Sequence, residues 1–231
     1  MAPFAKPVSA SRTLRVLAAL LGYPGAEMRR HLGAMRALLH EERALGGERL
    51  AELDALIDTL QRGDPLETEA AYVQLFDRGR ATSLHLFEHV HGDSRDRGPA
   101  MIDLAQTYEK SGLYLAPGEL PDYLPAVLEF VSTQPPREAR EFLGETAHIV
   151  NAIFNALQQR QSAYASVLGA LLELAGEKAQ AVKIVPDDPL DESWVEPAVF
   201  GGCSTEGQAS PGQPQPIRIV RQPIPAQGAS T

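Results

Sequence analysis

Apolar residues recur every three or four positions along most of the chain, which is the spacing of one face of an α-helix. The first such stripe contains Leu14, Leu17, Ala18 and Leu21. No stretch shows the sustained alternation of apolar and polar residues that marks a half-buried strand. The pattern predicts an all-α protein, with helices at about 14–21, 28–39, 50–60, 65–76, 84–90, 94–111 and 122–134, and a last apolar stretch from 136 to 175.

Several of these stretches begin or end at residues that favour helix termini. Asp64 followed by Pro65 supplies an N-cap and a proline at the first helical position. Gly63 and Gly112 are placed to close two other helices. The stretch from 136 to 175 fits one long or kinked helix, or two helices in series. The other expected helix starts are Ser9 or Ser11, Thr82 or Ser83, Asp93 or Ser94, and Pro121 with Asp122.

The composition changes after about Lys183. Eight of the 18 prolines follow it, a density that neither a helix nor a central strand tolerates. Six acidic residues and two arginines give this part a charge of 2 − 6 = −4, out of −9 for the chain. Its only aromatic residues, Trp194 and Phe200, could dock on the body or on a partner. We therefore expect a single-domain multi-helix bundle at 1–183 and a disordered, acidic, Pro-rich C-terminal tail at 184–231.

Composition and charge exclude several classes of protein. The net charge of −9 and the pI near 5.2 argue against nucleic-acid binding, which needs a basic surface. Cys203 is the only cysteine, so an intramolecular disulfide framework and a cysteine-rich metal site are excluded. The apolar run at 16–21 is too short to cross a bilayer or to form a signal peptide. We expect a cytoplasmic protein with no direct membrane insertion.

The sequence HLFEH at 85–89 matches the H-x-x-E-H pattern of one class of zinc metalloproteases. If 84–90 is helical, His85 and His89 lie one turn apart on one face, and Glu88 could polarise a zinc-bound water. A catalytic zinc also needs a third protein ligand, for which the sequence offers only scattered glutamates. A zinc-dependent hydrolase is therefore the alternative hypothesis, and a chance match on a partly buried helix is the simpler interpretation.

Other catalytic and nucleotide-binding signatures are absent from the sequence. The segment 92–96 departs from the G-x-S-x-G elbow at its last position, and no phosphate-binding loop occurs. The same part of the chain is instead dense in charge. This fits either a solvated surface of ion pairs or a polar-rimmed groove for a peptide helix. The residues concerned are Asp77, Arg78, Arg80, Glu88, Asp93, Arg95, Asp96 and Arg97, beside Phe76 and Phe87.

The segment 72–101, YVQLFDRGRATSLHLFEHVHGDSRDRGPAM, resembles the signature region of the respiratory nitrate reductase delta subunit family, the NarJ type of molybdenum cofactor assembly chaperone. A second motif agrees with it. ELPDY at 119–123 resembles the E-x-P-D-[HY] motif of the wider redox-enzyme maturation chaperone family. The resemblance extends from the Leu-Gly-Tyr-Pro break at 21–24 to about Gly176 and leaves the Pro-rich tail unmatched.

The resemblance implies an all-helical cytoplasmic chaperone without catalytic residues. We expect it to hold no metal ion and no cofactor of its own. It also implies a partner, the apo catalytic (alpha) subunit of membrane-bound nitrate reductase, bound through its N-terminal peptide. Such chaperones hold that subunit until the molybdenum cofactor is inserted and membrane docking can proceed. Molybdenum cofactor biosynthesis proteins are further candidate partners. An apolar groove with acidic surroundings would suit a basic amphipathic target helix.

The positions of the two motifs predict which residues bind the peptide. Apolar residues would contact its apolar face, carboxylates would attract its lysines or arginines, and arginines would hold the groove together. Histidines would make the affinity depend on pH near about 6.5. Pro121 and Asp122 would begin a helix, with Tyr123 packed over the site. The predicted peptide-binding residues are Phe76, Asp77, Arg78, Leu84, His85, Phe87, Glu88, His89, Arg95, Pro121, Asp122 and Tyr123.

Overall fold

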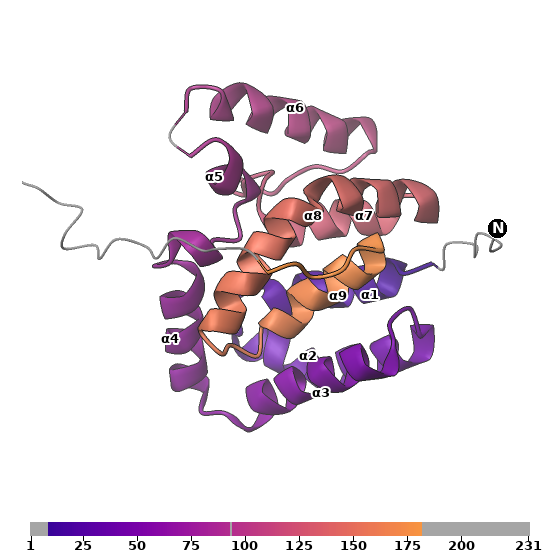
Figure 1. Cartoon of the computed structure of the whole chain (residues 1–231), viewed down its shortest axis with the longest axis vertical. Coiled ribbons are helices and arrows are strands. Elements are labelled where there is room, and N and C mark those ends of the chain that lie inside the picture. Colours follow the sequence, from indigo (N-terminus) through magenta and orange to yellow (C-terminus); the bar gives the residue numbers. More distant parts are fainter. Residues whose placement is uncertain (1–8, 93, 182–231) are drawn as a thin grey trace, which may run out of the picture. The chain divides into compact units, whose positions relative to one another are not determined.

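The computed structural model of the chain describes residues 9–92 and 94–181. Within these residues the chain forms α-helices and one short 3₁₀ helix but no strand, so the predicted all-α class is confirmed (Figure 1). The predicted tail at 184–231 lies outside the described residues. The helices are α1 (Ser11–Leu21), α2 (Ala26–Glu42), α3 (Gly47–Arg62), α4 (Pro65–Phe76), η1 (Arg80–Thr82), α5 (Leu86–Val90), α6 (Arg97–Lys110), α7 (Leu124–Thr133), α8 (Pro136–Gln159) and α9 (Ala165–Ala175).

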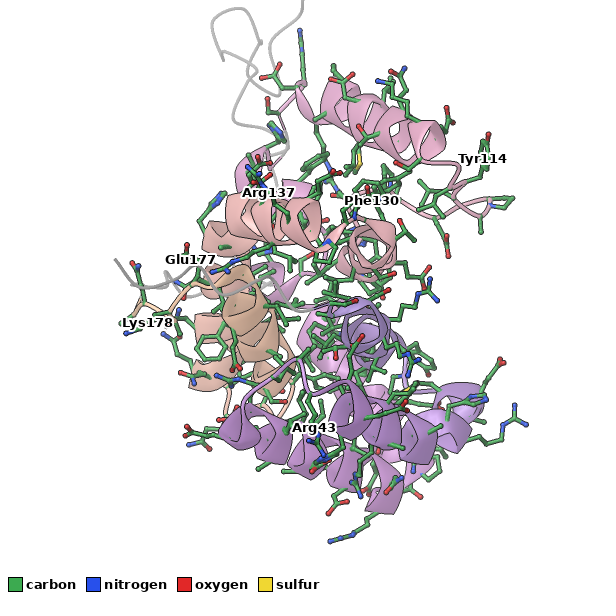
Figure 2. The ribbon with its side chains drawn as sticks, turned by 90° about the vertical axis from the view of Figure 1, so that its right-hand side faces the viewer. Arg43, Tyr114, Phe130, Arg137, Glu177 and Lys178 are labelled. Carbon is green, nitrogen blue, oxygen red and sulfur yellow. The ribbon has the colours of Figure 1, made fainter. Side chains whose placement is uncertain are left out.

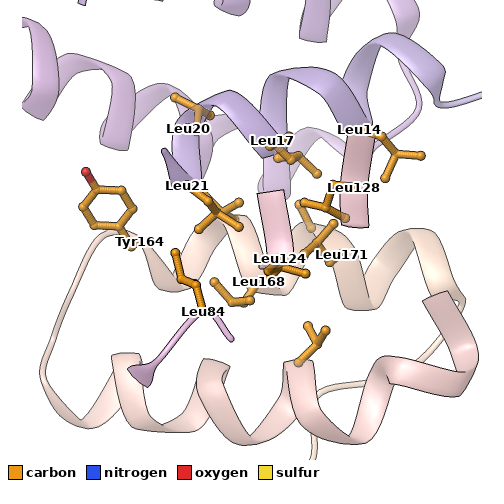
Figure 3. Close-up of a cluster of buried hydrophobic side chains, with 14 of the residues drawn as sticks. Leu14, Leu17, Leu20, Leu21, Leu84, Leu124, Leu128, Tyr164, Leu168 and Leu171 are labelled. Carbon is orange, nitrogen blue, oxygen red and sulfur yellow. The ribbon is translucent and has the colours of Figure 1, made fainter. Parts of the chain in front are cut away.

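The hydrophobic core lies where α1, α7, α8 and α9 pack together. The helix α1 packs along α7, and α8 packs along α9. Leucines at helical spacing on α1, α7 and α9 point into this core and are almost fully buried (Figure 3). Each such side chain contributes about 1.5–3 kcal/mol of burial free energy. The leucines that meet here are Leu14, Leu17, Leu20 and Leu21 of α1, Leu124 and Leu128 of α7, and Leu168 and Leu171 of α9.

The helices α2 and α3 form a hairpin that covers one side of this core. Their buried leucines and isoleucine face inward. On the outside, the Arg36 guanidinium of α2 pairs with two carboxylates of α3, Asp54 at 3.2 Å and Asp58. The pairs are partly exposed, so they fix the register of the hairpin more than they stabilise it.

Most of the predicted helix boundaries are confirmed. The carboxylate of Asp64 accepts the Glu67 backbone N–H at 3.1 Å and caps α4, with Pro65 as the first helical residue. Gly63 follows α3, and Gly112 follows the end of α6 in the left-handed conformation, with φ of 78°. The last apolar stretch is two helices, α8 and α9, because Gln161 adopts a positive φ between them.

Several predicted helix starts are wrong, and at the starts of α1, α5 and α7 the residues concerned bond distant parts of the chain. The Ser11 hydroxyl donates to the Ser132 carbonyl oxygen at 2.6 Å, and neither Ser9 nor Ser11 caps α1. The helix α6 begins at Arg97 rather than after Ser94. The helix α5 begins at Leu86, not at 84, and α7 begins at Leu124 rather than at Pro121. These last two shifts have one cause, the pairing of 84–86 with 122–124.

The helix α6 lies at the edge of the bundle and makes few contacts with other helices (Figure 1). Tyr108 is the only buried residue of α6. The centroid of the Tyr108 ring lies 4.8 Å from the centroid of the Phe130 ring in α7. The following loop extends away from the core, where Tyr114 is 80% exposed (Figure 2). Among the described α-helices of more than two turns, α6 therefore makes the smallest apolar contact with the core.

Candidate functional site

Two segments that carry the motifs, 84–86 and 122–124, lie side by side. The Leu124 backbone N–H donates to the Leu84 carbonyl oxygen at 2.8 Å, and the Leu86 N–H donates to the Asp122 carbonyl oxygen at 3.0 Å. Together they make an antiparallel bridge between His85 and Tyr123. The bridge joins parts of the chain that are far apart in sequence, so both motifs belong to one site.

The Asp122 carboxylate is the centre of this site and is fully buried. One oxygen accepts the Phe87 backbone N–H at 3.2 Å, and the other lies 3.2 Å from His85 Nδ1. The Arg97 guanidinium lies 3.7 Å from a carboxylate oxygen of Asp122 and 3.5 Å from a carboxylate oxygen of Glu88. His85, the N-cap residue of α5, makes no capping hydrogen bond with its own side chain. The Asp122 carboxylate, 35 residues away, instead caps the helix and places its negative charge at the N-terminus of α5.

The contact with Asp122 changes the chemistry of His85. The hydrogen bond to that carboxylate raises the pKa of His85 above its ordinary value, and burial of the ring opposes part of the effect. The nearby Glu88 raises the pKa further, while Arg97 lowers it. The imidazole ring lies 5.3 Å from the ring of Tyr123. Folding therefore shifts the equilibrium of His85 toward its protonated form.

A hollow of about 430 Å³ opens beside this centre. A smaller hollow of about 180 Å³ adjoins it, since the two share Arg80 and Glu88. Arg78 and Arg80 are exposed and form no ion pair with any other described residue. The rim therefore presents both signs of charge. The larger hollow is lined by Phe76, Asp77, Arg78, Gly79, Arg80, Ser83, His85 and Glu88, and the smaller one by Arg80, Glu88, Gly92 and Arg97.

Gly79 in the wall of the larger hollow is packed so closely that a side chain there would force its neighbours to shift. A Cβ at this position would lie 2.6 Å from the Thr82 hydroxyl oxygen and 2.8 Å from the nearest Arg160 guanidinium nitrogen. Arg160 follows α8, so the far end of that helix also supports the hollow. Sequence reasoning missed Arg160, because nothing local links it to a turn some 80 residues earlier.

The structure brings some of the predicted peptide-binding residues to the hollow and places others elsewhere. Asp77, Arg78, His85, Glu88 and the buried Phe76 line it. Peptide binding by any of the twelve stays a prediction. The remaining seven are distributed as follows: Leu84, Pro121 and Asp122 are buried, Phe87, His89 and Tyr123 are half-buried, and Arg95 is exposed outside both hollows.

The geometry does not support the zinc hypothesis. His85 lies outside α5 in extended conformation, so the assumed helical turn between it and His89 does not exist. The imidazole of His89 is hydrogen-bonded to the Ser83 carbonyl oxygen at 2.8 Å, while the imidazole of His85 is hydrogen-bonded to the Asp122 carboxylate. Among residues 9–92 and 94–181 there is no group of three His, Cys, Asp or Glu side chains arranged to hold a metal ion. In the same part of the chain, no helix is long and apolar enough to span a bilayer.

Comparison with known proteins follows the same direction. Residues 40–169 match the family model described as "Nitrate reductase delta subunit". The chain is 42% identical, over 78% of both chains, to the nitrate reductase molybdenum cofactor assembly chaperone NarJ of Escherichia coli K12. It is 33% identical to a Bacillus subtilis protein named "Probable nitrate reductase molybdenum cofactor assembly chaperone NarJ", over 69% of this chain and 86% of that one. These relatives are named as chaperones and not as enzymes.

A solved structure shows the same fold. It is that of a "Putative Redox Enzyme Maturation Protein" from Archaeoglobus fulgidus, which superposes with a TM-score of 0.52 at 21% identity. The match covers 77% of this chain and all of that one. The fold, the two joined motifs and the similarity over most of the body agree. The chain belongs to the nitrate reductase delta subunit family.

Proposed function

We propose that this chain is an assembly chaperone for membrane-bound nitrate reductase. It binds the N-terminal peptide of the apo catalytic subunit in the cytoplasm and permits insertion of the molybdenum cofactor before membrane docking. The observation that carries the proposal is the 42% identity to a chaperone of that name over 78% of both chains. The name supports the chaperone role, and the motif resemblance supports the choice of peptide and the order of events.

The two adjoining hollows are the best candidate for the peptide-binding surface. They lie beside His85, the residue of the first motif that pairs with Tyr123 of the second. Their lining combines the largely buried Phe76 with exposed or half-exposed carboxylates at Asp77 and Glu88. Carboxylates in that position can pair with lysine or arginine of an amphipathic peptide. Asp122 is enclosed and already bonded, so its part is to hold His85 and α5 in place behind the surface.

A titration with a synthetic peptide tests this function. The peptide carries the N-terminal sequence of the nitrate reductase catalytic subunit from the same organism, and binding heat is measured at pH 6, 7 and 8. We expect saturable binding. Replacing Asp77→Lys should weaken binding more at low salt than at high salt, because salt screens exposed charges. Glu145→Lys is the matched control, since Glu145 is an exposed carboxylate of α8 that lies outside both hollows.

The possible results separate the parts of the proposal. Absence of binding across this pH range would refute the proposed peptide function. If Asp77→Lys and Glu145→Lys weaken peptide binding equally, the affinity depends on the overall charge of the chain and not on the carboxylate at the hollow. Weakening that is independent of salt would remove the role assigned to the carboxylates.

A further inference from the structure

The helix α6 is attached to the bundle through its two ends. At its start, the Arg97 guanidinium pairs with Glu88 at 3.5 Å and with Asp122 at 3.7 Å. Near its end, the Tyr108 hydroxyl donates to the Pro121 carbonyl oxygen at 2.7 Å. Among the described residues, the side-chain polar contacts between α6 and the other helices or their loops come from these two residues. Tyr108 therefore contacts Pro121, and Arg97 contacts the adjacent residue Asp122.

Between its ends, α6 is only lightly packed. Its inner face carries Met101, Leu104 and Ala105, which are half-buried, while Ile102 on the other side is 60% exposed. The loop that follows α6 is largely exposed. A helix with few buried apolar contacts opens at a lower free energy cost than the core does. If both attachments break, little else holds α6 against the body.

One of the attachments is also part of the candidate binding surface. Arg97 lines the smaller hollow together with Arg80, Glu88 and Gly92. Glu88 supplies the carboxylate of this hollow and is paired with Arg97 in the free protein, while Arg80 on the same wall repels a cation. A lysine or arginine side chain is therefore held in this hollow only where it pairs with Glu88 directly. The incoming cation and Arg97 therefore compete for Glu88, and the competition weakens the start of α6.

We propose that α6 is a releasable strap, fastened at Arg97 and Tyr108, and that a cationic side chain in the smaller hollow releases it. The coupling half of this inference rests on the proposed peptide-binding function. Because linkage is reciprocal, whatever loosens α6 also favours the bound peptide. Release exposes the inner face of α6 and the Phe130 ring beneath it, which enlarges the apolar surface available to an amphipathic partner helix.

Amide hydrogen exchange of the full chain, followed by mass spectrometry, tests the strap without any peptide. Arg97→Gln and Tyr108→Phe should each speed exchange throughout 97–110 by about tenfold, the effect of losing one such interaction. Arg36→Gln is the matched control, because Arg36 also bridges two carboxylates, Asp54 and Asp58, but between α2 and α3. It should leave exchange in 97–110 as in the wild type.

Two results would overturn the strap. One is unchanged exchange in 97–110 in both variants. The other is faster exchange that appears equally in the core helices α1 and α9, which would mean global destabilisation. Tyr108→Phe retains the ring and its apolar packing, so it keeps the test interpretable should Arg97→Gln prove poorly folded.

Addition of the catalytic-subunit peptide tests the coupling. We expect exchange in 97–110 to rise on binding, and we expect Tyr108→Phe to bind the peptide several-fold more tightly than the wild type. A peptide that binds but leaves α6 protected would refute the coupling and leave the chaperone function intact. A peptide that fails to bind would refute the proposed function, and exchange in the free chain would then decide alone whether α6 is a strap.

Discussion

Removing the Asp122 carboxylate should destabilise the protein more than any other change at the candidate site. The carboxylate is fully buried and serves three partners, the Phe87 backbone N–H, the His85 imidazole and the Arg97 guanidinium. The variant Asp122→Ala removes all three interactions at once. The alanine methyl group cannot accept the Phe87 N–H, so the first turn of α5 loses its cap. His85 and Arg97 also lose the carboxylate that they share.

The cost can be worked from these contacts. Loss of a helix cap costs about 1 kcal/mol. Breaking a buried charge pair costs about 3–5 kcal/mol when the remaining charge stays buried. Here the side chains of His85 and Arg97 are 31% and 27% exposed, so water can compensate part of that loss. We therefore expect Asp122→Ala to lower the free energy of unfolding by about 2–4 kcal/mol. Asp122→Asn, which keeps an acceptor for the Phe87 N–H, should cost roughly half as much.

Urea unfolding followed by far-UV circular dichroism measures these differences from the shift in midpoint at constant slope. The exposed carboxylate of Glu145 provides the control, and Glu145→Ala should change stability by no more than about 0.5 kcal/mol. A loss below about 1 kcal/mol for Asp122→Ala would refute the reasoning. It would mean that α5 does not depend on a cap supplied from the second motif.

Three further predictions concern pH and close packing. Because folding raises the pKa of His85, the His85–Asp122 interaction stabilises the fold fully at pH values below the unfolded-state pKa of His85. This stabilisation is lost as the pH rises through the higher folded-state pKa. Urea unfolding at pH 5.5 and 8.5 should therefore show that His85→Gln lowers the free energy of unfolding more at the lower pH. Gly79→Ala places a methyl group against Thr82 and Arg160, so it should cost roughly 1–3 kcal/mol and weaken peptide binding in the same titration. Gly176→Ala forces alanine to a φ of 81° after α9 and should cost about 1 kcal/mol in thermal unfolding, without changing peptide affinity.

Helices with local signals could be predicted from the sequence with little error. Asp64 and Pro65 start α4 as expected, because the cap and the proline act within one turn. Gly63 and Gly112 end helices for the same kind of reason. The shifted starts of α1, α5 and α7 depend on contacts between distant segments. Ser11 bonds a residue 121 positions away, which no local pattern can reveal.

The candidate site shows the same division. The charge density and the two motifs indicated two parts of the chain that lie far apart in the sequence, and the structure shows that these parts adjoin. That they bind a peptide stays a prediction. Hydrophobicity alone could not tell a groove residue from a core residue, since Leu84 is buried and Phe87 is half-buried. Asp122 illustrates the same limit for charge. A carboxylate in a motif reads as a surface contact until its buried hydrogen-bond partners are known.

Photo-crosslinking within the complex tests the central claim most directly. The apo catalytic subunit is co-purified with the chain carrying a photoreactive phenylalanine analogue at Arg78, on the rim of the larger hollow. The same analogue at Arg30, an exposed residue of α2 outside both hollows, serves as control. We expect crosslinks from position 78 to the N-terminal segment of the subunit and none from position 30. A stable complex in which position 78 gives no crosslink, or in which both positions crosslink equally, would contradict the proposed site; failure to form any complex would contradict the chaperone function.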